Sequence, residues 1–562
     1  MLHAWFALKQ MPRLSLMLAI VISIGFSRAK ADQCHVVSPH QPDEAEKAYL
    51  AADYEQAAEL YRKELVSKPA DPGLIAGLSR ALERQQKSEE AVKVVIDALA
   101  IDPDPALLET RAEAEFYDGR PWDAEKTAQE AGKENLCNPR MHLLLARIDN
   151  LNSNYAAGRA QLLLAHQLDP TDSEIRRMWI STLPVRDQTA ELEKLLSEPA
   201  GLDAEERRAM EQNLEHLKKV LAEPPKPCRL VSNTRETEIV FSRLMRDATH
   251  IRAFGLNVKF NQRSANLEID TGASGLVVSR SIAERAGIKP FSEMDVHGIG
   301  DKKINSGYRG YADSIQIGSL EFHDCVVTVV DNSRMMDIDG LIGMNVFSRF
   351  LVTLDYPARK LLLGPLPKRP DEAAPATPSL NASNNDATET KTGEEPAKES
   401  PAAAPKKPSS GLHNRYIAPE MKDYTPVYRV GHQLILPVAL NMSNLKLFIL
   451  DTGSWATNIS PEAAREVTKV HSNDTLGVHG LNGKVEKVYS ADEITFTFAR
   501  IAQKIREVPS FDTTRISKSV GLKISGFLGA KTLDLTTIHI DYRDGLVKFD
   551  YDPKRIPTVG AY

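Results

Sequence analysis

The chain has 562 residues, enough for about three to four domains, and a formal net charge of −6 from 70 basic and 76 acidic side chains. Without a basic excess it is not expected to bind nucleic acid, because binding a polyanion needs a basic surface that displaces counterions. Hydrophobic residues make up 42% and charged residues 26%. This ordinary globular usage excludes a wholly disordered chain and a polytopic membrane protein.

The first 31 residues have the order of a secretory signal peptide. Lys9 and Arg13 precede an apolar run from 14 to 26, and small residues stand at Ala29 and Ala31. The run is shorter than the roughly 20 apolar residues that span a bilayer, so we predict cleavage after Ala31, with an uncleaved anchor as the alternative. The mature protein is then expected to be exported, periplasmic or secreted in a bacterium, with no stable membrane insertion.

Cysteines are few and widely spaced. No CxxC pair is present, so neither a disulfide scaffold nor a zinc site is indicated. Export would permit disulfides, but the spacing does not give their pairing. The cysteines are Cys34, Cys137, Cys228 and Cys325.

Residues 43–222 are predicted to form an array of paired helices. A period of about 34 residues runs from 43 to about 172, and a small residue recurs in it at Ala57, Ala91, Ala124 and Gly158. Such a residue lets two antiparallel helices approach closely, and a proline after the second helix ends it. The pattern resembles about four tetratricopeptide repeats, the third of them degenerate. The helix-like, charged stretch 173–222 fits a cap with a polar outer face.

The array suggests two roles. Repeats of this kind usually present a concave surface to peptides or partner proteins, so one expectation is a protein partner bound on the repeats. The other is a spacer or dimerisation module without a peptide ligand, because the sequence marks no binding face.

Beyond the proline-rich stretch 223–227, period-two alternation of apolar and polar residues replaces the helical pattern. This alternation predicts β-strands. The clearest strand-like runs are 236–241, 252–260, 265–269, 427–440 and 445–450.

Two Asp-Thr-Gly motifs stand in this region, each directly after an apolar run. They begin at Asp270 and Asp451. By chance, about 0.1 such motifs are expected in a chain this long, so two in the same context are a specific signal. An apolar pair followed by glycine stands 73 residues after the first Asp, at Gly343, and 78 residues after the second, at Gly529. An Asp-Tyr pair stands 12 residues after each glycine.

Residues 230–366 and 415–555 are therefore predicted to be two copies of one unit. Their pattern resembles the retropepsin-like aspartic proteases, whose signature is an apolar strand, Asp-Thr/Ser-Gly-Ala/Ser and a later apolar-apolar-Gly. The resemblance covers about half the chain. It implies two all-β acid-protease lobes behind the all-α array. It also implies an aspartic endopeptidase that acts on a peptide or protein substrate and needs no cofactor.

The mechanism that the resemblance implies needs two neighbouring carboxyl groups. Like charges at that distance cannot both ionise, so the pKa of one rises and that of the other falls. The ionised group takes a proton from water as general base, and the protonated group polarises the scissile carbonyl. Asp270 and Asp451, one from each lobe, are the expected catalytic dyad, and they titrate jointly.

Supporting roles are implied for the residues around the dyad. Thr271 and Thr452 are expected to hydrogen-bond across the lobe junction. Tight turns and close strand approaches are expected at four glycines, namely Gly272 and Gly453 in the loops and Gly343 and Gly529 beneath them. The hairpins that cover substrate have five candidate flap residues, Gly298, Ile299, Gly300, Gly480 and Leu481.

We expect no metal site in these flap loops. His297 and His479 stand in them, but no carboxylate cluster stands at ligand spacing around either. Trp455, four residues after Asp451, is larger than the small residue usual there. It either narrows one side of the cleft, packs under the flap or belongs to the core.

Residues 367–411 are rich in Pro, Ala, Glu and Lys and lack aromatic residues. They are predicted to be a disordered linker. A typical span of roughly 35–40 Å lets the lobes pair within the chain or, swapped, in a homodimer.

Two other functions compete with the protease. One is a non-catalytic peptide- or protein-binding scaffold on a protease-like fold, against which the survival of both Asp-Thr-Gly motifs argues. The other has each lobe homodimerise separately, which gives two different sites per assembly.

Overall fold

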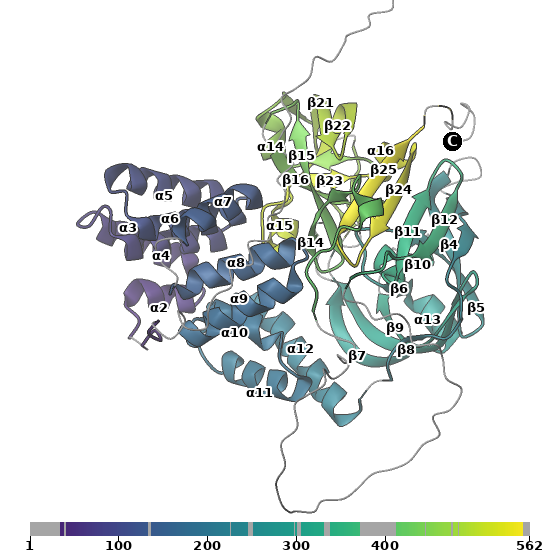
Figure 1. Ribbon diagram of the computed structural model, residues 1–562, viewed down its shortest axis with the longest axis horizontal. Helices are drawn as coiled ribbons and strands as arrows, with labels where there is room; N and C mark the ends of the chain where they lie inside the picture. Colours follow the sequence, from purple (N-terminus) through teal and green to yellow (C-terminus); the bar gives the residue numbers. More distant parts are fainter. Residues whose placement is uncertain are drawn as a thin grey trace, which may run out of the picture.

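The computed structural model describes most of the chain between residues 34 and 554. The described ranges are 34–38, 41–132, 137–224, 226–245, 251–296, 298–300, 305–330, 338–370, 412–443, 445–473, 476–480, 483–552 and 554. The predicted signal peptide, His297, Leu481 and residues 371–411 of the predicted linker lie outside them. Figure 1 shows the helical array on one side and two β-rich lobes on the other.

The N-terminal part is an array of helices that pack in consecutive pairs, which confirms the predicted fold class. The helices are α2 (Glu44–Leu50), α3 (Tyr54–Leu65), α4 (Pro72–Arg84), α5 (Ser88–Ile101), α6 (Pro105–Tyr117), α7 (Pro121–Ala131), α8 (Pro139–Leu151), α9 (Tyr155–Leu168), α10 (Ser173–Ile180), α11 (Val185–Leu196) and α12 (Ala204–Ala222). Capping residues and prolines in the sequence explain where several of these helices begin. At α4, for example, Asp71 accepts hydrogen bonds from the N–H groups of Gly73 and Leu74, and Pro72 occupies the first turn.

The small residues of the repeat lie where helices meet. Ala57, Ala91 and Ala124 are fully buried, and a Cβ added to Gly158 would lie 2.5 Å from Asn150 Oδ1. Helices α10, α11 and α12 fall in the stretch 173–222 predicted as a cap, and each packs against the next.

Contacts far apart in sequence hold the array together. A disulfide between Cys34 and Cys137 attaches the N-terminal segment to the loop before α8. The N–H of Gly201, in the loop before α12, donates to Leu50 O at the end of α2 (2.9 Å). The first and last parts of the array therefore touch each other.

Lobe 1 is built on a mostly antiparallel sheet in the order β1-β9-β6-β10-β5-β4-β8-β7, with β3 paired to β4. A disulfide between Cys228 and Cys325 joins the residue before β1 to β9. The elements are β1 (Arg229–Leu230), β2 (Thr237–Val240), β3 (Ser242–Met245), β4 (Ile251–Phe260), β5 (Arg263–Ile269), β6 (Leu276–Ser279), α13 (Arg280–Ala286), β7 (Lys289–Val296), β8 (Asn305–Ile317), β9 (Leu320–Val330), β10 (Gly340–Ile342), η2 (Met344–Phe347), β11 (Phe350–Asp355) and β12 (Lys360–Pro365).

Lobe 2 repeats this plan with a sheet in the order β14-β15-β16-β23-β17-β22-β21-β18. The elements are η3 (Pro419–Met421), β13 (Thr425–Pro426), β14 (Tyr428–Val430), β15 (Gln433–Leu440), β16 (Leu445–Leu450), β17 (Asn458–Ile459), α14 (Pro461–Arg465), β18 (Val470–Ser472), β19 (His479–Gly480), β20 (Gly483–Lys484), β21 (Tyr489–Phe498), β22 (Ile501–Ser510), α15 (Thr514–Val520), β23 (Gly526–Leu528), α16 (Ala530–Leu533), β24 (Thr536–Asp541) and β25 (Leu546–Tyr551).

The run 427–440, predicted as one strand, is a hairpin. Val430 pairs with Gln433, and the turn between them is possible because Gly431 has a φ of 58°, a left-handed conformation that glycine adopts without strain.

The two lobes meet within the chain through a third sheet, in the order β13-β25-β24-β11-β12-β2. Strand β11 of lobe 1 pairs antiparallel with β24 of lobe 2, with Val352 opposite Ile540 and Leu354 opposite Ile538. These side chains are fully buried in a hydrophobic core that both lobes share.

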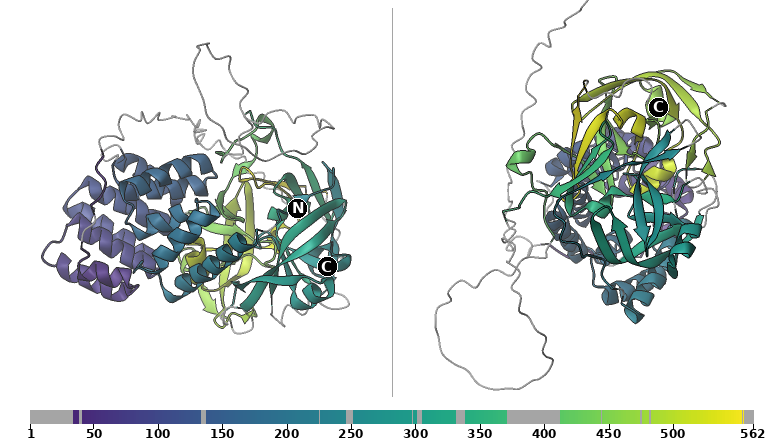
Figure 2. Two further views of the ribbon diagram at one scale, coloured as in Figure 1. Left: turned by 90° about the horizontal axis from the view of Figure 1, so that it is seen from below. Right: turned by 90° about the vertical axis from the view of Figure 1, so that its right-hand side faces the viewer.

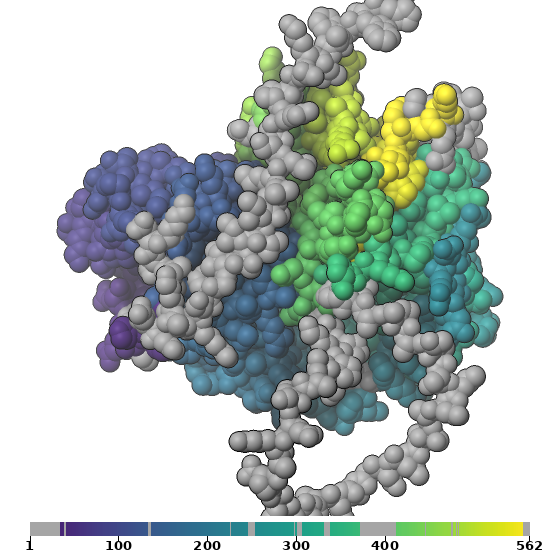
Figure 3. All heavy atoms as spheres, in the orientation of Figure 1, coloured from purple at the N-terminus to yellow at the C-terminus, as the bar shows by residue number. Residues whose placement is uncertain are grey.

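The array is packed against the lobes. Buried residues of α6, α7 and α8, among them Phe116 and Met141, form one hydrophobic cluster with buried residues of lobe 2, among them Leu522 and Phe527. At the other end of the array, Arg208 of α12 forms an ion pair with Asp295 of β7 in lobe 1 (2.9 Å). The right-hand view of Figure 2 shows one lobe above the other with the array behind them, and Figure 3 shows the array and the lobes side by side on one face.

Candidate active site

Each Asp-Thr-Gly loop begins where a buried strand ends beside a parallel partner. In lobe 1, β10 runs parallel to β5, with Ile342 opposite Ile269, and Asp270 N donates to Ile342 O (3.0 Å). In lobe 2, β23 runs parallel to β16, with Leu528 opposite Leu450. Asp451 N donates to Leu528 O (3.1 Å). The apolar-apolar-Gly segments seen in the sequence are thus the strands that position the two loops.

The structure brings Asp270 and Asp451 together at the lobe junction, where their side chains hydrogen-bond to each other. Within its own loop, Asp270 Oδ1 accepts from the N–H groups of Gly272 (2.8 Å) and Ala273 (3.1 Å). Asp451 Oδ1 accepts from Gly453 (3.1 Å) and Ser454 (3.2 Å) in the same way.

Gly272 and Gly453 leave room for the facing carboxyl group. A Cβ added to Gly272 would lie 2.8 Å from Asp451 Oδ1, and one added to Gly453 would lie 2.5 Å from Asp270 Cγ. A side chain at either glycine would collide with the facing carboxyl group.

The electrostatics of the pair favour one shared proton. Burial raises the pKa of Asp270, while its hydrogen bonds to Asp451 and to the loop N–H groups oppose the rise. Burial also raises the pKa of Asp451, and the neighbouring charge of Asp270 raises it further, well above the ordinary range. Two like charges this close cannot both persist away from water, so the pair holds a proton at a pH where isolated carboxyls have lost theirs.

Thr271 and Thr452 cross-link the two loops reciprocally. Thr271 Oγ1 donates to Leu450 O (2.7 Å) and accepts from the N–H of Thr452 (3.0 Å). Thr452 Oγ1 donates to Ile269 O (3.1 Å) and accepts from the N–H of Thr271 (3.1 Å). Both side chains are buried, so each hydroxyl satisfies polar groups that water does not reach.

Gly343 and Gly529 lie against the same loops. A Cβ on Gly343 would lie 2.3 Å from Ala273 O, and one on Gly529 would lie 2.4 Å from the carbonyl carbon of Ala456. The backbone approach at both positions is too close for a side chain.

The described parts of the two candidate flaps touch each other. A Cβ added to Gly480 would lie 2.4 Å from Ile299 O, and Arg515 of α15 donates to Gly300 O (3.3 Å). Ile299 packs against the hydrophobic cluster that lobe 2 shares with the array. Gly298 precedes this contact, and Leu481 lies outside the described residues.

Sequence reasoning missed one residue beside the dyad. His432, at the tip of the β14–β15 hairpin, places Nε2 2.9 Å from Gly272 O in the loop of the other lobe. The available signal was Gly431 within an alternating run, because an isolated glycine there marks a turn or bulge. Trp455 is 49% exposed, which excludes the core position considered for it.

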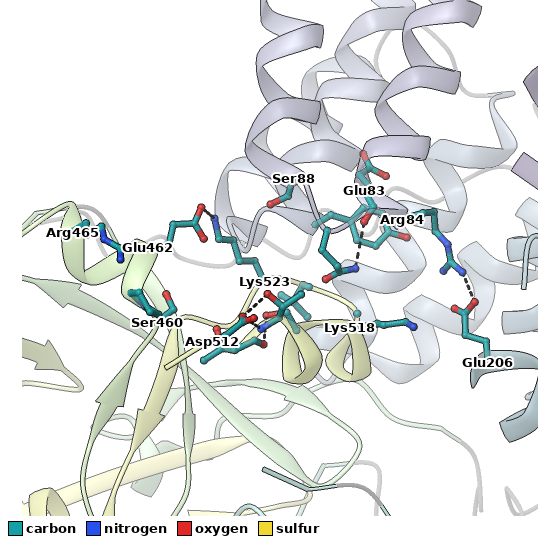
Figure 4. Close-up of a pocket in the computed structure, with 18 of the residues that line it drawn as sticks. Glu83, Arg84, Ser88, Glu206, Ser460, Glu462, Arg465, Asp512, Lys518 and Lys523 are labelled. Atoms are coloured by element: carbon teal, nitrogen blue, oxygen red, sulfur yellow. Dashed lines mark hydrogen bonds and ion pairs between the residues drawn. The ribbon is translucent and has the colours of Figure 1, made fainter. Parts of the chain in front are cut away.

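A separate cavity of about 310 Å³ lies between the array and lobe 2, and Figure 4 shows charged residues of both parts around it. The charges pair across this interface. Across the interface, Lys523 of lobe 2 contacts Glu89 of α5 (2.8 Å) and Lys518 of α15 contacts Asp203 (2.7 Å). Glu462 of α14, also in lobe 2, contacts Lys523 from its own side (3.0 Å). These pairs fix how the array sits on lobe 2.

Metal and membrane signals were also sought in the described part of the chain. There, no group of three or more His, Cys, Asp or Glu side chains is placed to hold a metal ion. No helix of the described ranges is long and apolar enough to cross a bilayer.

Comparison with known proteins gives a family match in lobe 1, where residues 256–346 match the model of an aspartyl protease family. A search of curated proteins finds no match.

Three solved structures show low similarity. An aspartic proteinase from Irpex lacteus is 12% identical, covers 58% of this chain and 100% of its own, and has a TM-score of 0.33. A thermophilic tetratricopeptide-repeat protein of Thermus thermophilus is 19% identical over 31% of this chain and 95% of its own, with a TM-score of 0.25. A retropepsin-like aspartic protease from Rickettsia conorii is 22% identical over 24% of this chain and 92% of its own, with a TM-score of 0.18.

The family match lies within lobe 1, and lobe 2 carries the second copy of the Asp-Thr-Gly motif. The chain resembles the retropepsin-like aspartic proteases in two tandem β lobes that follow N-terminal helical repeats of the tetratricopeptide kind.

Proposed function

We propose that this protein is an exported aspartic endopeptidase whose single active site uses Asp270 and Asp451. The observation that carries the proposal is the pair itself. Two carboxyl groups from equivalent loops hydrogen-bond to each other at the lobe junction, and burial raises the pKa of both. A structural ion pair joins opposite charges, whereas two buried carboxyl groups of like charge are costly unless they share a proton. Buried carboxyl pairs with perturbed pKa values are typical of catalytic sites.

In the proposed reaction the pair works with one proton and one negative charge. The ionised carboxylate removes a proton from water as the water attacks the scissile carbonyl carbon. The protonated carboxyl donates a hydrogen bond to the carbonyl oxygen, where negative charge develops. Collapse of the tetrahedral intermediate passes a proton to the leaving amine and restores the shared proton.

The loop contacts support this chemistry by keeping the carboxyl groups in place. N–H groups hold Oδ1 of each Asp, and the reciprocal threonine bonds set the distance between the loops. The two flaps, at 298–300 and 480–481, would cover bound substrate.

We further propose the domain division given by the sequence. It comprises a signal peptide at 1–31, repeats at 43–222, lobe 1 at 230–366, a linker at 367–411 and lobe 2 at 415–555. The two disulfides are compatible with export to a periplasmic or extracellular compartment. The array is proposed to recruit the substrate or a partner protein.

The test is cleavage of casein and of a peptide library from pH 3 to 7 by the full chain. Asp270→Asn and Asp451→Asn are each expected to reduce kcat by at least about 10³-fold, because one carboxyl cannot serve as acid and base together. Asp492→Asn, at an exposed Asp of β21, is the matched control and should cleave normally.

Two results would redirect the proposal. If each single variant kept about half the activity, the lobes would form separate homodimeric sites. If the unmodified chain cleaved nothing and bound no pepstatin-type inhibitor, the protein would be a binding scaffold on a protease-like fold.

A further inference from the structure

His432 reaches from lobe 2 into the active-site loop of lobe 1. It follows Gly431 in the two-residue turn between β14 and β15. Its Nε2 lies 2.9 Å from Gly272 O, and the same Gly272 donates its N–H to Asp270 Oδ1. Gly272 O also belongs to the peptide unit whose N–H, that of Ala273, donates to Asp270 Oδ1 (3.1 Å). One peptide unit therefore separates the hydrogen bond of His432 from the carboxyl group of Asp270.

Arg429 holds the hairpin that carries His432. Its guanidinium donates to Gly431 O (2.9 Å) and to Tyr542 O in the turn after β24. It also lies over the ring of Tyr155 in α9 of the array, 5.9 Å from the ring centroid. The hairpin tip is thus fixed by the strands that join the lobes and by the array.

The charged groups that act on His432 are Asp270 from the opposite lobe and Arg429 from its own hairpin. Burial lowers the pKa of His432, and Arg429 lowers it further, while the bond to Gly272 and the charge of Asp270 oppose the change. The ring is neutral at pH 7 and gains its charge in acid. A neutral ring protonated on Nε2 still donates to Gly272 O, so the hydrogen bond persists in both states.

We propose that His432 is a positioning residue of the active site, which holds the Asp270 loop across the lobe junction and places a positive charge beside the dyad in acid. This inference rests on the proposed peptidase function. A charged imidazole stabilises the ionised dyad. The dyad then keeps its single negative charge to lower pH than it would without the histidine.

Kinetics separate the two parts of the proposal. His432→Gln keeps a side-chain N–H donor but cannot carry a charge. We expect the acid limb of its kcat/KM profile to move up by about half to one pH unit and the basic limb to move less, because the ring carries its charge only in acid. His432→Phe also removes the donor, and its kcat should fall about 5- to 10-fold at the pH optimum with KM nearly unchanged.

A matched control excludes a general effect of losing a half-buried histidine. His539 of β24 bonds Thr353 and Asp550 in the inter-lobe sheet, and its pKa is also lowered by burial. His539→Gln should leave both limbs in place. Profiles of His432→Gln and wild type that superpose would overturn the charge role, and a His432→Phe variant with wild-type kcat would overturn the positioning role.

A second measurement works without turnover. NMR titration of the His432 ring in the full chain and in the Asp270→Asn variant reports their coupling directly. We expect the pKa of His432 to fall in the variant, because removal of the carboxylate removes the charge that opposes the fall. An unchanged His432 titration would overturn the charge role whether or not the protein cleaves peptides. Failure of the proposed function would instead appear as absent cleavage with the coupling intact.

Discussion

Thr271 and Thr452 show how much of the lobe junction depends on two hydroxyl groups. Each hydroxyl donates to a carbonyl of the opposite lobe and accepts from the N–H of the other threonine. Because these groups are buried, loss of one hydroxyl leaves a carbonyl and an N–H without partners.

Thr452→Val, which keeps the shape of the side chain but removes its hydroxyl, is expected to lower the free energy of unfolding by about 2–3 kcal/mol and to reduce cleavage at least tenfold. Urea denaturation and initial-rate kinetics measure the two effects. Thr452→Ser keeps the hydroxyl and should lose about 1 kcal/mol or less. A valine variant as stable and active as wild type would show that the cross-link is dispensable.

The carboxyl of Asp451 links stability to pH. Burial and the charge of Asp270 raise its pKa in the folded protein, so the folded chain retains a proton that the unfolded chain releases above about pH 3.9. The stability linked to Asp451 is therefore greatest below that pH and declines as the pH rises through the raised pKa.

An asparagine at position 451 cannot ionise, so Asp451→Asn should remove this decline of stability with rising pH. We expect the variant to gain more free energy of unfolding relative to wild type at pH 7 than at pH 4, as measured by urea denaturation at both values. Asp492→Asn, at an exposed site, should differ little from wild type at either pH. An equal gain for Asp451→Asn at the two values would contradict the raised pKa.

At the residue scale, the sequence predicted the dyad and threonine positions because each is part of a short motif after an apolar strand. It did not predict His432, whose partner Gly272 is 160 positions away. No local pattern encodes such a contact, since it depends on how two lobes are placed.

At the scale of elements, the described parts of the two candidate flaps pack closely against each other. Gly480 lies so close to Ile299 that an added Cβ would be 2.4 Å from its carbonyl oxygen. Gly480→Ala should therefore separate the two candidate flaps. Since we propose that they close over substrate, kcat/KM should fall on the order of tenfold.

Steady-state kinetics with a fluorogenic peptide measure this effect. The matched control is Gly364→Ala on β12, where nothing lies within 4 Å of the added Cβ, and it should retain wild-type kinetics. If both alanine variants behaved alike, the contact between the flaps would have no part in catalysis.

Strands and helices with strong local signals were predicted well. The alternating runs at 252–260 and 445–450 are close to β4 and β16, and the 34-residue period matches the succession of helix pairs. The alternation of the run 427–440 continues through the turn and so predicts one strand, whereas the hairpin depends on the left-handed conformation of Gly431.

For the whole molecule, the packed interface between array and lobe 2 predicts that they unfold together. Leu522 is 3% exposed within the cluster shared with α6–α8. Leu522→Asp buries an unpaired charge there and should destabilise the protein by about 3–5 kcal/mol. The helical circular dichroism signal and cleavage activity should be lost in the same, lower thermal transition.

Ile96→Asp serves as the control, because Ile96 on α5 is 46% exposed, and its effect should stay within about 0.5 kcal/mol. Helical signal that melts at the wild-type temperature while activity is lost earlier would show that the array and lobes are independent.

The sequence alone predicted the order of the parts and the two motifs on which the proposed chemistry depends. Helical period, helix caps, strand alternation and the two Asp-Thr-Gly motifs are local, and local backbone preferences and burial patterns are enough to express them. Only the tertiary structure shows the contacts between distant segments. They are the cysteine pairs, the pairing of the lobes within the chain, the contact between the candidate flaps, the position of His432 beside Asp270 and the packing of the array against both lobes. These contacts join residues about 90 to 430 positions apart, and their energy comes from surfaces that exist only after each part has folded.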